Sequence, residues 1–356
     1  MRRSARVTIH PQALRHNLQQ AKLAAPHAKA LAVIKANAYG HGMLEVANIL
    51  TDADGYAVSC IPEAQTLRES GTQHPILVLQ GHQNQSDLLI ASKLDLRLVI
   101  HSKDQLAFFD QIQIQPIKVA LKIDTGMHRL GIKPQDTHSL YTLLQNHPNI
   151  DPDIWLMTHL SCADELENNY TNIQLETFKQ CSAQLSAPKS IANSAGILAW
   201  SASHSQWIRP GIMLYGSSPF RHQKKDQNKY NLQAAMTLSA PLIAIHQFKK
   251  GEPIGYGASF LCPHDMQVGI VACGYADGYP RHAETGTPVN INRQEAYTVG
   301  RVSMDMIAIS LHNISAKVGD LVELWGTKVS VDRVAHHAET ISYELLCNAG
   351  NNCTRN

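Results

Sequence analysis

The chain has 356 residues, a formal net charge of +2 and 17% charged residues. This length allows two domains, and the balanced charge excludes the strongly basic surface typical of nucleic-acid-binding proteins. The start Met1-Arg2-Arg3 is not followed by an apolar segment, and no apolar run is long enough to span a bilayer, so we expect a cytoplasmic protein. The seven cysteines include no CxxC pair, and the nineteen histidines lack ligand spacing, so we expect free thiols and no metal site.

Short apolar runs alternate with amphipathic segments through the first two thirds of the chain. We expect helices at 11–25, 62–70, 135–146 and 164–185, and the first two begin with proline. Eight strands that alternate with helices predict a (β/α)8 TIM barrel. A doubly wound open sheet is the alternative, but no GxGxxG follows the first strand. The expected strands are 30–35, 56–60, 76–80, 96–101, 117–124, 154–159, 190–193 and 208–215.

Residues suited to chemistry follow these strands, where a barrel carries its active site. The first strand ends in Lys35, and a lysine at the end of a buried strand must be charged at a cost, neutral or covalently bound. Loops after the seventh and eighth strands commonly bind phosphate in this fold, and Ser194 and Gly211 offer a hydroxyl and an accessible backbone N–H there. The other strand-end residues of interest are Lys122, Asp124, Arg129, His159, Asn193, Arg209 and Ile212.

The pattern changes at the polar segment 221–231, which we interpret as a linker. Short alternating strands and turn signals then predict a second, mostly antiparallel β domain. We therefore expect a barrel domain at 1–225 and a β-strand domain at 226–356, and the first few residues can pack on the second domain. Residues 330–347 are expected to be helical in part. The expected strands are 235–242, 267–273, 295–302, 306–310 and 321–324.

Nine motifs along nearly the whole chain resemble those of the alanine racemase family. They are VIKANAYGHG, LKIDTGMHRLG, THL followed by ADE, ANSAG, RPGIMLYG, IGYGASF, GYADGYPR, GRVSMDM and ISYELLC. One such motif would be weak evidence, but nine in order make a specific match. The resemblance implies a barrel domain, a C-terminal β domain, pyridoxal 5'-phosphate (PLP) as cofactor, and a homodimer with active sites shared between subunits.

The resemblance also implies which residues hold the cofactor. Lys35 matches the lysine that binds PLP covalently, and Arg209 matches the arginine that donates to the pyridine nitrogen. A guanidinium has a pKa above ~12 and cannot give its proton to the ring, so the cofactor would be a weaker electron sink than with a carboxylate partner. Taken alone, Lys35 could be a surface lysine and Ser194 a helix cap. The residues that match phosphate ligands or belong to their loops are Tyr39, Asn193, Ser194, Gly211, Ile212 and Tyr343.

Racemisation removes a proton from one face of Cα and returns one on the other, so one base per face is the simplest arrangement. By resemblance, Lys35 serves D-alanine, and Tyr256 serves L-alanine from the other subunit with His159 as its hydrogen-bond partner. Arg129 and the backbone N–H of Met304 match the groups that hold the substrate carboxylate. The remaining matches are Lys122, carbamylated in many members, and the entrance residues Tyr275, Arg281, Arg301, Ile341 and Tyr343.

The sequence therefore predicts an alanine racemase that supplies D-alanine for peptidoglycan. A related racemase of broad specificity or for serine, a decarboxylase, and a non-catalytic PLP carrier are the alternatives. Arg209 argues against the decarboxylase, which should favour an acidic partner for the pyridine nitrogen. The domain that contains Tyr256 argues against the carrier. One departure from the family is Ser303, which occupies a position that is cysteine in some members, and we expect little effect from it.

Overall fold

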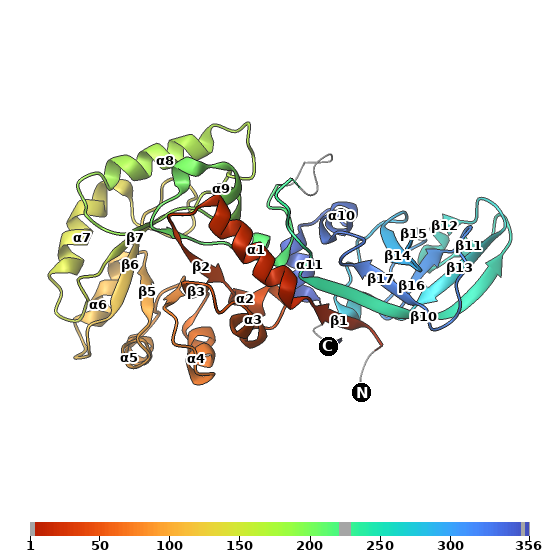
Figure 1. The fold of residues 1–356 in the computed structure, drawn as a ribbon, viewed down its shortest axis with the longest axis horizontal. Coiled ribbons are helices and arrows are strands. Elements are labelled where there is room, and N and C mark those ends of the chain that lie inside the picture. The colour runs from red at the N-terminus through yellow and green to blue at the C-terminus, as the bar shows by residue number, and fades with distance from the viewer. Residues whose placement is uncertain (1–3, 221–228, 350–352, 356) are drawn as a thin grey trace.

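A computed structural model describes residues 4–220, 229–349 and 353–355, so most of the predicted linker and the expected boundary at 225/226 lie outside the described residues. A closed barrel wrapped by helices lies at one end of the molecule, and a mostly antiparallel sheet lies at the other (Figure 1). This architecture confirms the predicted fold class. Within the described ranges, no helix combines the length and apolarity needed to cross a membrane.

The barrel is closed by parallel pairing of β2 through β9, with β9 returning to β2. Its strands are apolar on both faces, because one face packs inside the barrel and the other packs under the helices. The strands are β2 (Lys29–Val33), β3 (Gly55–Val58), β4 (Ile76–Val78), β5 (Arg97–Ile100), β6 (Lys118–Lys122), β7 (Trp155–Met157), β8 (Lys189–Ser190) and β9 (Trp207–Ile208).

Several predicted strands were too long at their carboxyl ends. The strand predicted at 208–215 ends at Ile208, because Pro210 has no N–H for the ladder and a 3-10 turn, η4 (Ile212–Tyr215), follows. The strand predicted at 190–193 ends at Ser190, and Asn193 instead caps the next helix. The strand predicted at 30–35 ends at Val33, so Lys35 lies in the turn after it.

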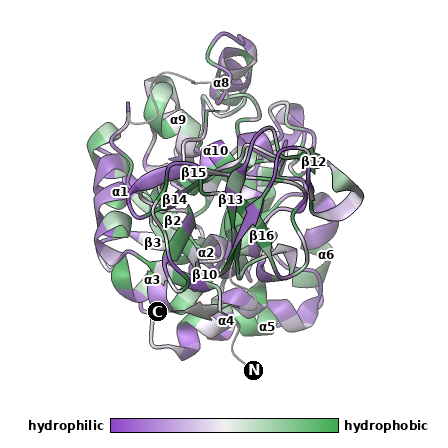
Figure 2. Ribbon diagram, turned by 90° about the vertical axis from the view of Figure 1, so that its right-hand side faces the viewer, coloured by the Kyte–Doolittle hydropathy of each residue, from purple (hydrophilic) through white to green (hydrophobic). Residues whose placement is uncertain are grey.

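Amphipathic helices cover the barrel, and their ribbons carry both hydrophilic and hydrophobic residues (Figure 2). Helix α1 buries Leu14 and Leu18, while Leu23 is exposed. The helix predicted at 164–185 begins only at Tyr170, because turns occupy the residues before it. The helices are α1 (Pro11–Ala24), α3 (Met43–Ile49), α4 (Ile61–Glu69), α5 (Gln85–Lys93), α6 (Leu106–Phe109), α7 (Thr137–Gln145), α8 (Tyr170–Cys181) and α9 (Ser194–Ala199).

The second sheet has the strand order β13-β16-β15-β14-β17-β10-β1-β18. Its longest strand, β10, pairs with β1, β13 and β17, so the first strand of the chain belongs to the C-terminal sheet. The sequence analysis did not predict β1, β11, β12, β14 or β18. The strands are β1 (Arg6–Ile9), β10 (Met236–Phe248), β13 (Met266–Val271), β14 (Pro288–Ile291), β15 (Gln294–Thr298), β16 (Ile307–Ser310), β17 (Leu321–Trp325) and β18 (Thr354–Arg355), beside the hairpin of β11 (Pro253–Ile254) and β12 (Phe260–Leu261).

Two helices, α10 (Val331–His337) and α11 (Ser342–Asn348), return from this sheet to the barrel. They account for the segment 330–347 that was predicted to be partly helical. Gly40, after the Lys35 turn, packs so closely on α11 that a Cβ there would collide with the carbonyl oxygen of Leu346. Helix α11 is therefore held against the carboxyl ends of the barrel strands.

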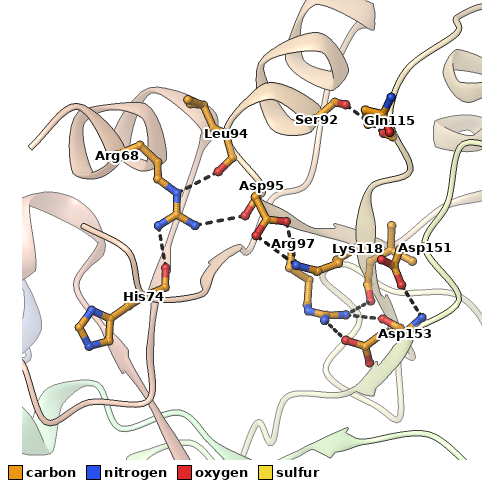
Figure 3. A network of polar contacts seen from close by, with 11 residues as sticks. Arg68, His74, Ser92, Leu94, Asp95, Arg97, Gln115, Lys118, Asp151 and Asp153 are labelled. Atoms are coloured by element: carbon orange, nitrogen blue, oxygen red, sulfur yellow. Dashed lines mark hydrogen bonds and ion pairs between the residues drawn. The ribbon is translucent and has the colours of Figure 1, made fainter. Parts of the chain in front are cut away.

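A buried arginine, Arg97, joins several segments by polar contacts at the amino-terminal ends of the barrel strands (Figure 3). The guanidinium of Arg97 donates to the carbonyl oxygens of Val119 and Asp153 and forms an ion pair with the Asp153 carboxylate. It also lies 3.9 Å from the ring centroid of Trp155, which stacks on Trp207. Three barrel strands and the loop before β7 are thereby joined through one side chain.

Replacing Arg97 with methionine should lower the free energy of unfolding by about 1–3 kcal/mol, because it leaves buried carbonyl oxygens without their donor. The side chain of Lys103 is 63% exposed and lies 3.9 Å from Asp136, so the matched control Lys103→Met should change stability by less than about 1 kcal/mol. Urea unfolding of both variants measures the difference. Equal losses in the two variants would contradict a special role for Arg97.

Candidate active site

A cavity of about 1070 Å³ lies at the carboxyl ends of the barrel strands and extends to α10 and α11. Both domains line it, as is common for enzyme sites on this fold. Most residues that the sequence analysis singled out meet here. The predicted residues that line the cavity are Lys35, Tyr39, Lys122, Arg129, His159, Asn193, Ser194, Arg209, Gly211, Ile212, Ile341 and Tyr343.

Lys35 begins a left-handed turn rather than an ordinary helix. The four residues that follow it, Ala36 to Tyr39, have φ values of 53°, 53°, 54° and 51°, and Gly40 continues at 80°. Left-handed backbone costs roughly 1–2 kcal/mol per residue for L-amino acids, so neighbouring contacts must hold this segment. The side chain of Asn37 accepts a hydrogen bond of 2.8 Å from the Met43 N–H, and this fixes the far end of the turn.

The Lys35 amine lies in a basic environment. Burial lowers its pKa first, and the nearby guanidinium of Arg129 lowers it further. The pKa of Lys122 is lowered to about 8, again by burial first and then by Arg209, Arg129 and Lys35. These four cations form a basic cluster that suits an anionic ligand.

Arg129 stands after a tight turn that Asp124 builds at the end of β6. One oxygen of the Asp124 carboxylate accepts hydrogen bonds of 3.0 Å from the N–H groups of Gly126 and His128. These bonds favour the charged carboxylate and hold the pKa of Asp124 below its usual value, although burial acts in the opposite direction. The turn directs the chain back so that Arg129 lines the cavity.

Ser194, Gly211 and Tyr39 form a polar recess at the other side of the cavity. The hydroxyl of Ser194 accepts hydrogen bonds from the N–H groups of Gly211 at 2.9 Å and Met213 at 3.3 Å. A Cβ at Gly211 would lie 2.9 Å from the Tyr39 hydroxyl, so only glycine leaves this recess open. The Tyr39 ring stacks on Tyr215, with centroids 4.7 Å apart. Hydroxyls and backbone N–H groups of this kind suit a phosphate.

Tyr343 and Asn193 border the same recess in different ways. The ring of Tyr343, on α11, lies 5.9 Å from that of Tyr39. The side chain of Asn193 accepts a hydrogen bond from the Gly196 N–H at 3.0 Å and donates to the Leu160 carbonyl oxygen at 3.1 Å. Asn193 therefore shapes the start of α9 while it lines the cavity.

Arg209 is anchored by the ends of β7 and β8. Its guanidinium donates to the Ser190 hydroxyl at 2.7 Å, to the carbonyl oxygens of Thr158 at 2.7 Å and Ile191 at 3.1 Å, and approaches His159 Nδ1 at 3.3 Å. Burial lowers its pKa to about 10, so it stays charged at neutral pH. The sequence analysis placed Ser190 at the start of the strand 190–193 but gave it no part in the site, because a single serine in a strand carries no distinctive signal.

His159 is neutral in this setting. Burial and then the charge of Arg209 lower its pKa well below the usual value. Because a guanidinium can only donate, we assign Nδ1 as the acceptor of the Arg209 bond, which places the ring proton on Nε2. His159 can therefore donate a hydrogen bond from Nε2 to an oxygen in the cavity.

The remaining predicted residues lie outside this cavity within a single chain. Tyr256 is 66% exposed and Met304 is 54% exposed, and both belong to the second domain. Gly257 lies beside the Arg301 guanidinium, and the N–H of Tyr275 donates to the Ser303 carbonyl oxygen at 3.1 Å. Arg281 is also exposed.

Comparisons with known proteins agree with this architecture. Residues 9–219 match the family model "Alanine racemase, N-terminal domain", and residues 235–356 match "Alanine racemase, C-terminal domain". The alanine racemase of Halorhodospira halophila is 45% identical over 350 residues, which cover 98% of this chain and 96% of the relative. That of Nitrosococcus oceani is 46% identical over 341 residues, covering 95% of each chain.

Solved structures give the same result. The crystal structure of biosynthetic alanine racemase from Pseudomonas aeruginosa aligns with a TM-score of 0.95 and 42% identity, covering 100% of this chain and 99% of that one. The crystal structure of alanine racemase from Bartonella henselae with covalently bound pyridoxal phosphate aligns with a TM-score of 0.87 and 27% identity, covering 99% of each. The chain therefore belongs to the alanine racemase family and is an isomerase.

Proposed function

We propose that the protein interconverts L-alanine and D-alanine with PLP, and that it supplies D-alanine for peptidoglycan in the cytoplasm. The observation that carries this proposal is the joint placement of Lys35, the Ser194–Gly211 recess and Arg209 around one cavity. The related structure from Bartonella henselae, which holds covalently bound pyridoxal phosphate, supports the same cofactor for this chain.

The residues present fit PLP at three points. The recess at Gly211, which a Cβ would fill, suits the phosphate, with Tyr39, Ser194, Ile212 and Tyr343 as its expected partners. Lys35 would hold the cofactor covalently through Nζ. Arg209 would donate to the pyridine nitrogen and, because it stays charged, would not protonate it. When bound, PLP withdraws electrons from the Cα–H bond of an attached amino acid and makes that proton removable.

The chain's own groups would then move the proton on opposite faces of Cα. Lys35 would take it from D-alanine, and the lowered pKa of Lys35 increases the fraction of neutral amine available as base. Tyr256 of the partner subunit would take it from L-alanine. Free tyrosine has a pKa of ~10 and is a poor base at neutral pH. The Nε2–H of His159 would stabilise its phenolate by donating a hydrogen bond.

The substrate would be held and selected by residues from both subunits. Arg129 and the backbone N–H of Met304 of the partner subunit would bind its carboxylate, since a fixed guanidinium fork suits a carboxylate. Ile341 and Tyr343 line the cavity and would meet the partner's Tyr275 at a narrow entrance that suits a methyl side chain. The partner's Arg281 and Arg301 would complete this entrance.

Lys122 would carry a carbamate in this reading. Its pKa of about 8 leaves part of the amine neutral near neutral pH, and only the neutral amine reacts with CO2. The resulting anion would replace one positive charge of the basic cluster with a negative one. It would also position the guanidinium of Arg129 for the substrate carboxylate.

A racemase assay with several amino acids tests the function directly. We expect the purified protein to convert L-alanine to D-alanine and back, with serine, lysine and arginine much poorer substrates. Chiral chromatography of the products with added PLP provides the measurement. Comparable turnover of lysine or arginine would sink the alanine assignment and favour a broad-specificity racemase, and no turnover would contradict the proposal.

Mixing two inactive variants tests the shared active site. Lys35→Ala and Tyr256→Phe should each abolish most activity, because each removes one of the two bases. After unfolding and refolding together, hybrid dimers would have one site with both bases, so the mixture should recover about a quarter of the wild-type activity. Each variant refolded alone is the control. No recovery in a mixture that contains hybrid dimers would contradict a site built from two subunits.

Gly211→Ala tests the phosphate recess. Crowding at the Tyr39 hydroxyl costs typically ~1–3 kcal/mol, so we expect PLP binding to be about 5- to 150-fold weaker. Gly55→Ala is the matched control, since its Cβ would lie 2.7 Å from the Leu31 side chain but away from the cavity. Absorbance titration gives the PLP affinity, and thermal unfolding gives the stability. Equal affinities in the two variants would argue against this recess as the phosphate site.

A further inference from the structure

Glu63 connects the first peptide after Lys35 to the neighbouring barrel strand. It lies in the first turn of α4, and each of its carboxylate oxygens accepts one backbone hydrogen bond. Oε1 accepts from the Ala36 N–H at 2.8 Å, and Oε2 accepts from the Ser59 N–H at 2.7 Å. Ala36 and Ser59 both line the cavity. Neither the motifs nor the site residues singled out from the sequence include Glu63.

The position of this carboxylate matters because the turn after Lys35 is strained. Four residues in succession adopt left-handed backbone angles, and Ala36 and Ala38 have no polar side chain that could hold them there. Asn37 fixes the far end of the turn through the Met43 N–H. Glu63 fixes the near end, at the peptide next to the Lys35 Cα, so the direction of the Lys35 side chain depends on it.

Glu63 also differs in charge from most groups that face Lys35. From the ends of the barrel strands, Arg129 and Arg209 disfavour the charged amine, as does burial. Lys122 and His159 belong to the same basic surroundings. Glu63 on α4 and the Cys347 thiol on α11 act in the opposite direction and raise the pKa of Lys35. Among the groups that act on the charge of the Lys35 amine, Glu63 is the one that bears a carboxylate.

We propose that Glu63 is a positioning residue for Lys35, which holds the left-handed turn in register with β3 and supplies the counter-charge to the amine. The inference rests on the proposed role of Lys35 as the PLP-binding lysine. The first turn of α4 thereby influences the reactivity of Lys35, which lies in the turn after β2. Glu63 itself is not among the residues that line the cavity.

Loss of the negative charge of Glu63 and loss of its two backbone hydrogen bonds have separable consequences. Glu63→Gln keeps one oxygen acceptor but presents an NH2 group to the second backbone N–H, and it takes away the negative charge. Glu63→Asp keeps the charge, but its shorter side chain cannot reach both donors. Both variants should misplace Lys35, and only the first should lower the pKa of the Lys35 amine further.

The first measurement is the rate at which the cofactor-free protein acquires PLP on Lys35, read by borohydride reduction and peptide mass spectrometry. Misplacement by about 1 Å can reduce a reaction rate by ~10²-fold, so we expect loading to slow by about 10- to 100-fold in Glu63→Gln and Glu63→Asp. Asp87→Asn is the matched control, because Asp87 also accepts a backbone N–H, from Gln83 at 2.8 Å, in the first turn of the next helix. Asp87→Asn should acquire PLP on Lys35 at the wild-type rate.

The second measurement is the pH dependence of Lys35 acetylation by acetic anhydride, which reacts with the neutral amine. The midpoint should move to lower pH in Glu63→Gln and stay in place in Glu63→Asp and Asp87→Asn. Circular dichroism checks that each variant is folded. Loading rates and midpoints of Glu63→Gln equal to those of Asp87→Asn would overturn the inference. Labelling of another lysine by PLP in the wild type would instead overturn the proposed cofactor site, and the acetylation midpoints would still test Glu63.

Discussion

Repulsion among four basic side chains is the interaction on which the site depends. Lys35, Lys122, Arg129 and Arg209 line one cavity. Lys122 and Arg209 are buried and Lys35 is half-buried, so water screens these three charges only in part, whereas Arg129 is exposed. Each one ends or follows a barrel strand whose position is fixed by its neighbours, so the barrel brings their backbones to one rim. Such a cluster is relieved by losing protons or by binding anions. A phosphate and a carboxylate are the two anions that the proposed cofactor and substrate would bring.

The positive potential of these four side chains, together with burial, has different effects on different groups. Burial first, and this positive potential second, favour the neutral form of Lys35 and Lys122, which is the form that reacts with an aldehyde or with CO2. Burial first, and then the charge of Arg209, keep His159 neutral, so that this ring can both accept from Arg209 and donate from Nε2. Arg209 stays charged because even a pKa of about 10 lies far above neutral pH. One electrostatic environment therefore assigns three distinct roles.

The sequence predicted the barrel because its strands are local apolar runs, and their order alone requires parallel pairing. It predicted the cavity residues because parallel strands bring their carboxyl ends to one rim. It could not predict β1, whose partner β10 lies more than two hundred residues away. The left-handed turn after Lys35 also escaped, since Ala36 and Ala38 have ordinary helical propensities. Its cause lies partly in the local bond from Met43 to Asn37 and partly in two contacts with more distant segments, namely Glu63 and the packing of Gly40 on α11.

The two domains divide the chemistry unequally within one chain. Helix α11 is tied to the barrel, since the Ser217 hydroxyl lies 2.6 Å from that of Ser342 and donates to the buried carboxylate of Asp332. Tyr343 follows Ser342 directly, so these hydrogen bonds also fix the position of Tyr343 beside the recess. Tyr256, in contrast, projects from the exposed surface of the second domain. A single chain thus assembles the groups that would hold the cofactor, whereas Tyr256, the proposed second base, lies exposed on another surface. Under the proposed two-subunit site, loading of the cofactor would depend on the chain alone and turnover on its association.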